Sequence, residues 1–237
     1  MSGHSKWNSI KHKKGVADAK RGKIFTSLCK QITVAARKGG GDTKFNFSLR
    51  LAVNKAKMAN VPKDNIDRAI KRGTGELEGM QIEEKRYEGF GPGGVAIIVD
   101  ALTDNSNRTV ADLRHMFSKL GGNMEGSVSW QFDQKGIISV PGQAAKANDE
   151  NWMLEAIDAG IDDVDTVEED LVIITPPTNL QKIQTWLEEQ GLETEEAALH
   201  MLPKDTTKLE DSENLEKLLD ALDEHDDVEK VFHNAEL

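Results

Sequence analysis

Residues 136–202 read GIISVPGQAAKANDENWMLEAIDAGIDDVDTVEEDLVIITPPTNLQKIQTWLEEQGLETEEAALHML. Short apolar runs alternate here with helix-length segments of 3.6-residue periodicity, and proline and glycine separate them. The predicted elements are, in chain order, a strand at Gly136–Val140, a helix at Glu150–Gly160, strands at Val164–Glu168 and Leu171–Thr175, a helix at Asn179–Gln190 and a strand at Glu193–Leu202. This β-α-β-β-α-β order is typical of a ferredoxin-like domain. In the first of these helices, Trp152, Leu154 and Ile157 are the apolar candidates for burial.

The segment before this stretch has the pattern of a second α+β module. Gly91-Pro92-Gly93-Gly94 is a strong turn signal, and the apolar run Val95–Val99 that follows is typical of a covered strand. A helix then begins near Thr109, which with Asp112 resembles a capping box. Ser127–Phe132 alternates strictly between polar and apolar residues, which predicts a half-buried strand with Trp130 inside.

The C-terminal tail carries one leucine-striped helix, over residues 215–222, and one strand, Val228–His233. A lone helix and strand cannot bury their apolar faces, and the module at 85–132 lacks a second helix. We therefore expect the tail to complete that module, which makes residues 135–203 an insertion within it.

The N-terminal third of the chain predicts three short helices. The first begins near Ile24 and stops at the glycines 39–41, and the second spans about 46–59. The third restarts at Pro62, which suits a first helical turn, and is ended by Gly73. Short connections between short helices favour a small bundle.

The predicted fold is therefore α+β, with an N-terminal three-helix bundle plus two α/β sandwich domains of ferredoxin-like type, one inserted in the other. The expected domains are a basic N-terminal arm at 1–23, a helical domain at 24–79, a discontinuous α+β domain at 80–134 and 204–237, and an inserted acidic ferredoxin-like domain at 135–203.

Charge is strongly segregated along the 237 residues, whose formal net charge is −11. Residues 1–72 hold 18 lysines and arginines against four acids, a net charge of +14, whereas residues 73–237 hold 12 bases and 37 acids, a net charge of −25. Such asymmetry indicates a basic region for a polyanion joined to an acidic body. Residues 149–202 hold 15 acids and only one base, Lys182, and we expect this stretch to face away from nucleic acid or to meet a basic protein.

The candidate nucleic-acid-binding residues are basic, histidine and tryptophan side chains of the N-terminal region and three polar side chains of the loop before Thr109. They are His4, Lys6, Trp7, Lys11, His12, Lys13, Lys14, Lys20, Arg21, Lys23, Arg37, Lys38, Asn105, Asn107 and Arg108. If four to seven of the N-terminal cations meet phosphates, the logarithm of the binding constant should fall with the logarithm of salt concentration at a slope of roughly −3 to −6.

Other function classes find little support in the residues. No apolar run approaches the length of a membrane span, the N-terminus lacks a secretory signal, and the single cysteine, Cys29, cannot form an internal disulfide or a thiolate metal cluster, so a cytoplasmic protein without membrane contact is expected. Glu224–Asp227 is the one metal-like cluster, and a solvated helix end explains it better. Gly89–Gly94 resembles a phosphate loop, but a strand follows it instead of a helix. We therefore expect no catalytic site, metal, cofactor or small-molecule substrate, and favour a non-enzymatic monomer.

Seven motifs in order along the chain resemble the YebC family. They are Gly3-His-Ser-Lys-Trp7, Asp18-Ala-Lys-Arg-Gly-Lys23, Ala35-Ala-Arg-Lys-Gly-Gly-Gly-Asp42, Pro62-Lys-Asp-Asn-Ile66, Tyr87-Glu-Gly-Phe-Gly-Pro-Gly-Gly94, Leu102-Thr-Asp-Asn-Ser-Asn-Arg-Thr109 and Gly126-Ser-Val-Ser-Trp130. The resemblance implies three domains, no catalytic residues and a probable transcriptional regulator that binds DNA. Related members, including mitochondrial translational activators, act on translation and associate with the ribosome. Two departures are Phe47, where the family often has proline, and a shorter segment at 123–126.

Two functions share the same basic N-terminal surface. One is a DNA-binding transcription regulator, and the alternative is an RNA- or ribosome-binding translation factor. No recognition helix with base-reading Asn, Gln or Arg side chains stands out, which weakens sequence-specific DNA reading. Glycine- and lysine-rich segments suit RNA, which proteins recognise largely by its shape, at least as well as they suit DNA.

Replacing Lys11, Lys13 and Lys14 with glutamate is expected to abolish polyanion binding and leave the chain folded, because the arm supplies charge and not core. Fluorescence anisotropy with labelled oligonucleotides at low salt measures the binding, and circular dichroism checks the fold. Unchanged binding at low salt would contradict the role of the arm.

Overall fold

The computed structural model describes residues 19–79 and 81–236. These residues form two units. One unit comprises residues 19–127, apart from residue 80, together with 211–231, and the other comprises 128–210 with 232–236. The expectation of an α+β fold, with helices first and sheets after them, is confirmed.

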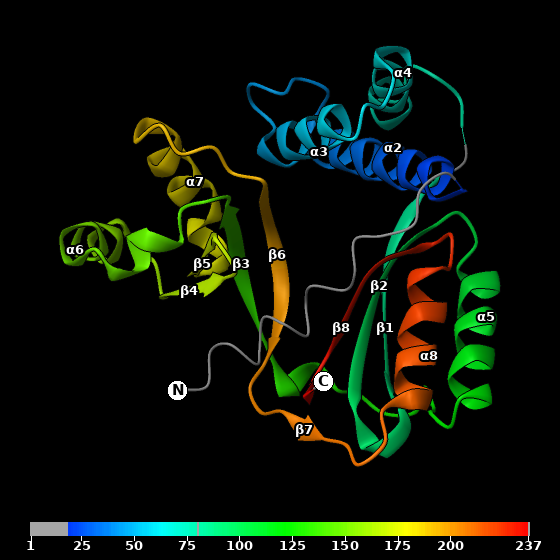
Figure 1. Ribbon diagram of the computed structural model, residues 1–237. Helices are drawn as coiled ribbons and strands as arrows, with labels where there is room; N and C mark the ends of the chain where they lie inside the picture. Colours follow the sequence, from blue (N-terminus) through cyan, green and yellow to red (C-terminus); the bar gives the residue numbers. More distant parts are fainter. Residues whose placement is uncertain (1–18, 80, 237) are drawn as a thin grey trace. The chain divides into compact units, whose positions relative to one another are not determined.

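In the described residues the first unit begins with three helices, as predicted, although the first of them starts at Ala19 and not near Ile24 (Figure 1). They are α2 (Ala19–Gly39), α3 (Phe47–Met58) and α4 (Lys63–Gly73). Their shared core includes Leu28, Ile32, Leu49, Val53 and Ile66. Burial of these apolar stripes stabilises helices that are too short to be stable alone.

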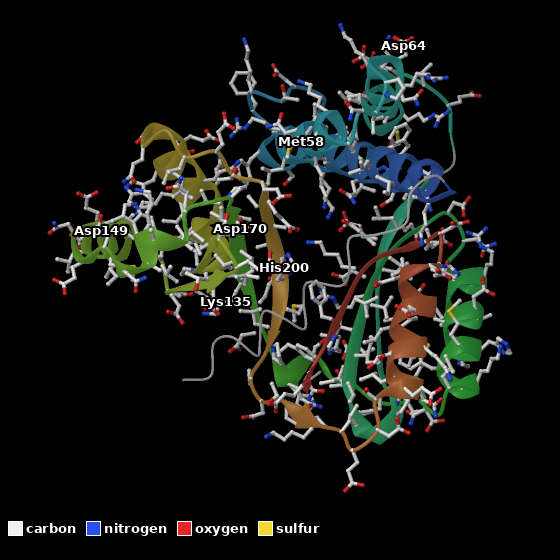
Figure 2. All side chains as sticks on the ribbon, in the orientation of Figure 1. Met58, Asp64, Lys135, Asp149, Asp170 and His200 are labelled. Atoms are coloured by element: carbon white, nitrogen blue, oxygen red, sulfur yellow. The ribbon has the colours of Figure 1, made fainter. Side chains whose placement is uncertain are left out.

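Two local signals set where these helices begin. The side chain of Asn46, just before α3, accepts a hydrogen bond from the amide of Leu49, a typical N-cap. Helix α4 follows Pro62 and carries Asp64 in its first turn (Figure 2), where a carboxylate interacts favourably with the positive end of the helix dipole.

The same unit contains a three-stranded sheet in the order β1-β2-β8. Its strands are β1 (Glu83–Phe90), β2 (Ala96–Thr103) and β8 (Val228–His233), and its helices are α5 (Ser106–Lys119) and α8 (Glu213–Asp223). β1 and β2 form an antiparallel hairpin across the short 3-10 helix η1 (Pro92–Gly94), where Gly93 has a positive φ of 69°. The tail strand β8 lies beside β2, and α5 and α8 contact each other against the sheet (Figure 1).

The second unit contains a four-stranded sheet in the order β4-β5-β3-β6, with every neighbouring pair antiparallel. Its strands are β3 (Phe132–Val140), β4 (Asp163–Val167), β5 (Asp170–Thr175) and β6 (Glu196–Pro203), and its helices are α6 (Glu150–Ala159) and α7 (Leu180–Glu189). This connectivity is ferredoxin-like, as predicted. The remaining short elements are the 3-10 helices η2 (Ser129–Gln131), η3 (Ala144–Asn148) and η4 (Pro177–Asn179) and the parallel pair β7 (Thr207–Lys208) and β9 (Ala235–Glu236).

The prediction of a strand at 127–132 with Trp130 inside is wrong. Residues 129–131 form η2, closed by a hydrogen bond of 2.9 Å from the amide of Gln131 to the carbonyl of Val128, and Trp130 is 69% exposed. Val128 and Phe132 are both buried, as predicted. A single tight turn between two buried residues satisfies the same alternation and turns the intervening indole to solvent.

The predicted burial of Leu154 and Ile157 is also wrong, because these side chains are 63% and 57% exposed. Trp152 and Ala156, four residues apart, form the buried stripe of α6. The Trp152 ring lies 5.7 Å from that of Trp186 on α7, which sets which face of α6 turns inward. The four-part division into an arm, a helical domain and two α+β domains stays a prediction.

Candidate nucleic-acid interface

Most of the predicted basic arm lies outside the described residues. This applies to His4, Lys6, Trp7, Lys11, His12, Lys13 and Lys14, and the side chains of Lys20 and Arg21 are likewise not described. Lys23 is the first candidate whose side chain is placed, and its ammonium group donates to the carbonyl oxygen of Asp223. That contact joins α2 to the end of α8 within one unit.

Arg37 and Lys38 lie in the last turn of α2, where basic side chains interact favourably with the negative end of the helix dipole. The Arg37 guanidinium donates to the carbonyl of Ile82 at 2.7 Å, and Lys38 Nζ lies 2.6 Å from Glu84 Oε2. Both side chains are exposed. Because an exposed ion pair contributes little to stability, a phosphate can replace the Glu84 carboxylate at small energetic cost.

Asn105, Asn107 and Arg108 were expected in a loop before a helix near Thr109, but α5 begins at Ser106, so they lie at its N-cap and in its first turn. The Asn105 side chain accepts a hydrogen bond of 3.1 Å from the Arg108 amide and so caps α5. The Arg108 guanidinium donates to Asp104 Oδ1 at 2.9 Å and to Asp227 Oδ2 at 2.7 Å. Asn107 is exposed. Two of the three side chains thus have internal structural roles, and their contact with nucleic acid stays a prediction.

Asp227 is the centre of a polar cluster that sequence reasoning missed. Asp227 is 4% exposed, so the expectation that residues 224–227 are a solvated helix end is wrong at Asp227. The carboxylate accepts hydrogen bonds from Lys30 Nζ at 2.8 Å, Arg108 at 2.7 Å and Thr109 Oγ1 at 2.9 Å. Lys30 also donates to the carbonyl of Leu102 at 3.0 Å. These contacts hold α2 against the sheet of the same unit.

The pKa of Asp227 reflects this cluster. Burial by itself raises the pKa of a carboxyl group, but the hydrogen bonds from Lys30, Arg108 and Thr109 outweigh it and hold the pKa of Asp227 well below its usual range. The group is therefore an anion at every physiological pH. The Asp227 carboxylate neutralises Lys30 and Arg108, two cations that the sequence alone would suggest are free to bind phosphate.

Six other cations of the helical region are exposed and make neither an ion pair nor a side-chain hydrogen bond within the described chain. These helical basic residues are Lys44, Lys55, Lys57, Lys63, Lys71 and Arg72. They lie in the loop before α3, in the last turn of α3, at the start of α4 and in its last turn. They were not among the residues predicted from the sequence to bind nucleic acid, although the net charge of +14 over residues 1–72 includes them.

Catalytic and metal-binding arrangements are not apparent in the part of the chain that the structure describes. No group of three or more His, Cys, Asp and Glu side chains among residues 19–79 and 81–236 is placed to hold a metal ion. Burial raises the pKa of the Cys29 thiol, more than Arg72 and Arg68 lower it, so the thiol is a poor nucleophile. His225 faces Asp112 at 3.4 Å and thereby links α8 to α5.

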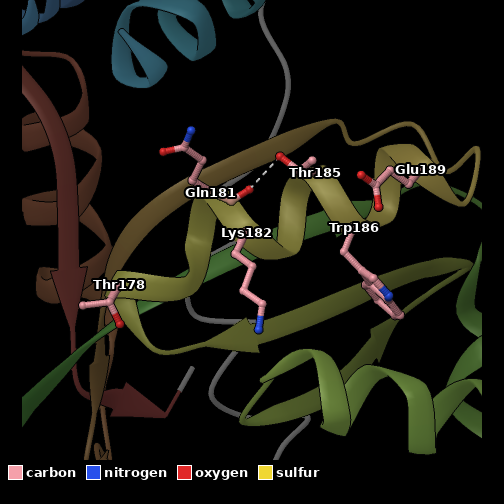
Figure 3. Close-up of a pocket in the computed structure, with 6 residues that line it drawn as sticks. All are labelled: Thr178, Gln181, Lys182, Thr185, Trp186 and Glu189. Carbon is pink, nitrogen blue, oxygen red and sulfur yellow. Dashed lines mark hydrogen bonds between the residues drawn. The ribbon is translucent and has the colours of Figure 1, made fainter. Parts of the chain in front are cut away.

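A shallow pocket runs along α7 in the other unit (Figure 3). Its lining residues are Thr178, Gln181, Lys182, Thr185, Trp186 and Glu189. The Lys182 ammonium already donates to the carbonyl of Ala159 at 2.6 Å, and the Thr185 hydroxyl donates to the carbonyl of Gln181 at 3.1 Å. Two of its polar groups are therefore satisfied by the protein itself.

Family models match nearly the whole chain in two consecutive parts. Residues 5–76 match the TACO1/YebC protein N-terminal domain, and residues 82–235 match the TACO1/YebC second and third domain. The chain belongs to the TACO1/YebC family. The resemblance found in the motifs is thereby confirmed, and the helical basic residues all fall within the N-terminal domain of the family.

TACO1/YebC relatives are similar over their full lengths. A probable transcriptional regulatory protein of Caldanaerobacter subterraneus is 52% identical over all of this chain and 99% of its own length. One of the same name from Desulforapulum autotrophicum is 51% identical over all of this chain and 97% of its own. The crystal structure of a conserved hypothetical protein from Aquifex aeolicus matches with a TM-score of 0.84 and 46% identity, over 97% of this chain and 96% of that one.

These names support a regulatory protein of the TACO1/YebC family. Among the helices that the structure describes, none has the length and apolar character needed to span a membrane.

Proposed function

We propose that this chain is a non-enzymatic regulator of gene expression that binds nucleic acid through its helical region. The observation that carries the proposal is the set of six exposed cations in 40–73 whose side chains make neither an ion pair nor a hydrogen bond in the described chain. Elsewhere the chain is strongly acidic, with a net charge of −25 over residues 73–237. Phosphates are therefore attracted to one region and repelled from the rest.

The relatives are named probable transcriptional regulatory proteins, and because transcription is regulated on DNA, a DNA-binding transcriptional regulator is the specific form of the proposal. RNA of the ribosome is the alternative, because phosphate contacts by lysine and arginine position a protein on either polymer and carry no sequence information. Crosslinking in cells followed by sequencing of the bound nucleic acid separates the two. Discrete promoter sites favour transcription, and enrichment of ribosomal RNA favours translation.

Removing the charge of four helical basic residues is expected to weaken binding about 10- to 100-fold near 0.1 M salt and to reduce the salt slope by roughly 2 to 4. The substitutions are Lys57→Gln, Lys63→Gln, Lys71→Gln and Arg72→Gln. Fluorescence anisotropy over a salt series with labelled DNA and RNA measures both quantities.

A matched control removes four cations from the α5, 204–208 and α8 regions and so changes the net charge equally. Its substitutions are Lys119→Gln, Lys204→Gln, Lys208→Gln and Lys217→Gln. The proposal requires this control to bind much like the unaltered protein. Equal weakening by both variants would show a general charge effect and would count against an interface in the helical region.

A further inference from the structure

The loop between α2 and α3 holds an aromatic ring in solvent. Phe45 is 88% exposed, more than any other large apolar side chain in the described residues. A single exposed apolar residue is ordinary on a protein surface and indicates nothing by itself. What distinguishes Phe45 is the combination of a well-anchored loop and the charge around it.

The loop is anchored by the residue next to Phe45. Asn46 is 6% exposed, and its amide nitrogen Nδ2 donates to the carbonyls of Ala35 and Gly40, each at 2.8 Å. Its backbone amide also donates to the carbonyl of Asp42 at 2.9 Å. These bonds fix the backbone between the end of α2 and the start of α3. Phe45 therefore projects from a braced turn and is not needed for the packing of that turn.

Basic residues lie on both sides of Phe45 in the sequence. Residues 37–50 carry four basic residues and one acid, Asp42. Lys44, directly before Phe45, is exposed and makes no ion pair within the described chain. On the first turn of α3, the Arg50 guanidinium lies 5.3 Å from the centre of the Phe47 ring. The segment thus presents positive charge and an uncovered aromatic face together.

An exposed aromatic ring beside an unpaired lysine suits one kind of ligand particularly well. Proteins bind single-stranded nucleic acid by stacking bases on aromatic side chains while lysine and arginine contact the neighbouring phosphates. In a continuous duplex both faces of each base are covered by its neighbours, so a phenyl ring reaches a base face without unstacking the duplex only at an unpaired nucleotide or a strand end.

We propose that Phe45 is a stacking platform for an unpaired base, with Lys44 placed for an adjacent phosphate. This inference rests on the proposed nucleic-acid binding and narrows its ligand to single-stranded segments, loops or strand ends. RNA and DNA offer the same stacking chemistry, and the test below distinguishes them.

The test compares labelled oligonucleotides of about 12 nucleotides, a length within the usual site size for single strands. The probes are oligo-U, oligo-dT, an abasic DNA strand of equal length, and a blunt duplex. Phe45→Ala is expected to weaken oligo-U or oligo-dT binding about 5- to 100-fold and to leave binding of the abasic strand unchanged, because that strand keeps its phosphates and lacks bases. Whichever of oligo-U and oligo-dT loses more affinity on the Phe45→Ala substitution identifies RNA or DNA as the preferred ligand.

Two further variants make the result specific. Leu77→Ala removes another exposed apolar side chain of the same unit, 40% exposed, and is expected to bind every probe normally. Phe45→Trp should retain binding, and its added fluorescence should be quenched by oligo-U or oligo-dT but not by the abasic strand. Since Phe45 is almost fully exposed, none of these results should reflect unfolding.

The outcomes separate this inference from the proposed function. If the Phe45→Ala variant binds all probes as the unaltered protein does, and Phe45→Trp shows no quenching, the stacking role is overturned and a protein partner becomes the better explanation of the exposed ring. Phosphate binding would still stand in that case. If the unaltered protein binds none of the probes at low salt, the proposed function itself fails.

Discussion

Replacing Asp227 with alanine is expected to lower the free energy of unfolding by about 3–5 kcal/mol, the usual cost of removing one partner of a buried ion pair. The carboxylate is 4% exposed and receives hydrogen bonds from Lys30, Arg108 and Thr109. Without it, the partly buried Lys30 ammonium loses its anion and the Thr109 hydroxyl loses an acceptor. The helix α2 would then be held less firmly against the sheet of its unit.

Urea denaturation, followed by circular dichroism, measures this change. Asp226→Ala is the matched control, because its side chain is exposed and makes no hydrogen bond within the described chain. A double-mutant cycle with Lys30→Ala should give a coupling energy of about 1–3 kcal/mol, since the two side chains are in direct contact. Equal effects of the substitutions at 226 and 227 would contradict the role assigned to the cluster.

The contribution of Asp227 is also expected to depend on pH. Its folded-state pKa is depressed below the unfolded value of about 3.9, so its stabilisation is fully present above that value and is lost as pH falls toward the folded pKa. The stability difference between the unaltered chain and Asp227→Ala should therefore be constant near neutrality and shrink below about pH 4. A difference that grows on acidification would show that the carboxylate is not stabilised by its cations.

Gly73→Ala is expected to destabilise the chain by about 3 kcal/mol through overpacking. A Cβ atom at this position would lie in hard contact with the carbonyl oxygen of Thr33 and 2.6 Å from the Cβ of Ala36. Both are backbone or near-backbone atoms of α2 and cannot swing aside as a flexible side chain would. The two helices would have to separate, and the core they share would loosen.

Gly22→Ala tests whether this cost comes from packing or from the loss of glycine itself. Gly22 also lies within a helix, and no atom of the described residues lies within 4 Å of a Cβ built there. Alanine is a better helix former than glycine by about 1 kcal/mol, so this control should be neutral or more stable. If thermal unfolding showed the same loss for both variants, close contact between α2 and α4 would not be the reason for Gly73.

Gly73 also shows what residues close together in the sequence cannot reveal. The sequence predicted that the third helix ends at Gly73, and α4 does end there, but no signal in the sequence indicated that glycine is also needed for contact with α2. A glycine can stand at this position because it ends the helix or because it lets α4 contact α2 closely. The amino-acid sequence is the same in both cases. Trp130 is a similar case, because a strand and a tight turn both bury Val128 and Phe132.

The elements themselves were well predicted because their signals are local. Helical periodicity, the turn at Gly91–Gly94 and the β-α-β-β-α-β order each depend on residues a few positions apart, and backbone propensity acts over that range. The boundaries were less accurate. The last strand of the inserted module was expected at Glu193–Leu202 and is observed at Glu196–Pro203, because pairing with β3 decides where it begins.

The sequence by itself determined the α+β class, the family and the segregation of positive charge into the first 72 residues, since these depend on composition and local order. Only the tertiary structure decided which cations remain available. Lys30 and Asp227 are 197 positions apart, and no local pattern announces that the chain brings them to 2.8 Å. Folding neutralises some basic side chains and leaves others exposed with Phe45, because pairing and burial are set by contacts between distant segments.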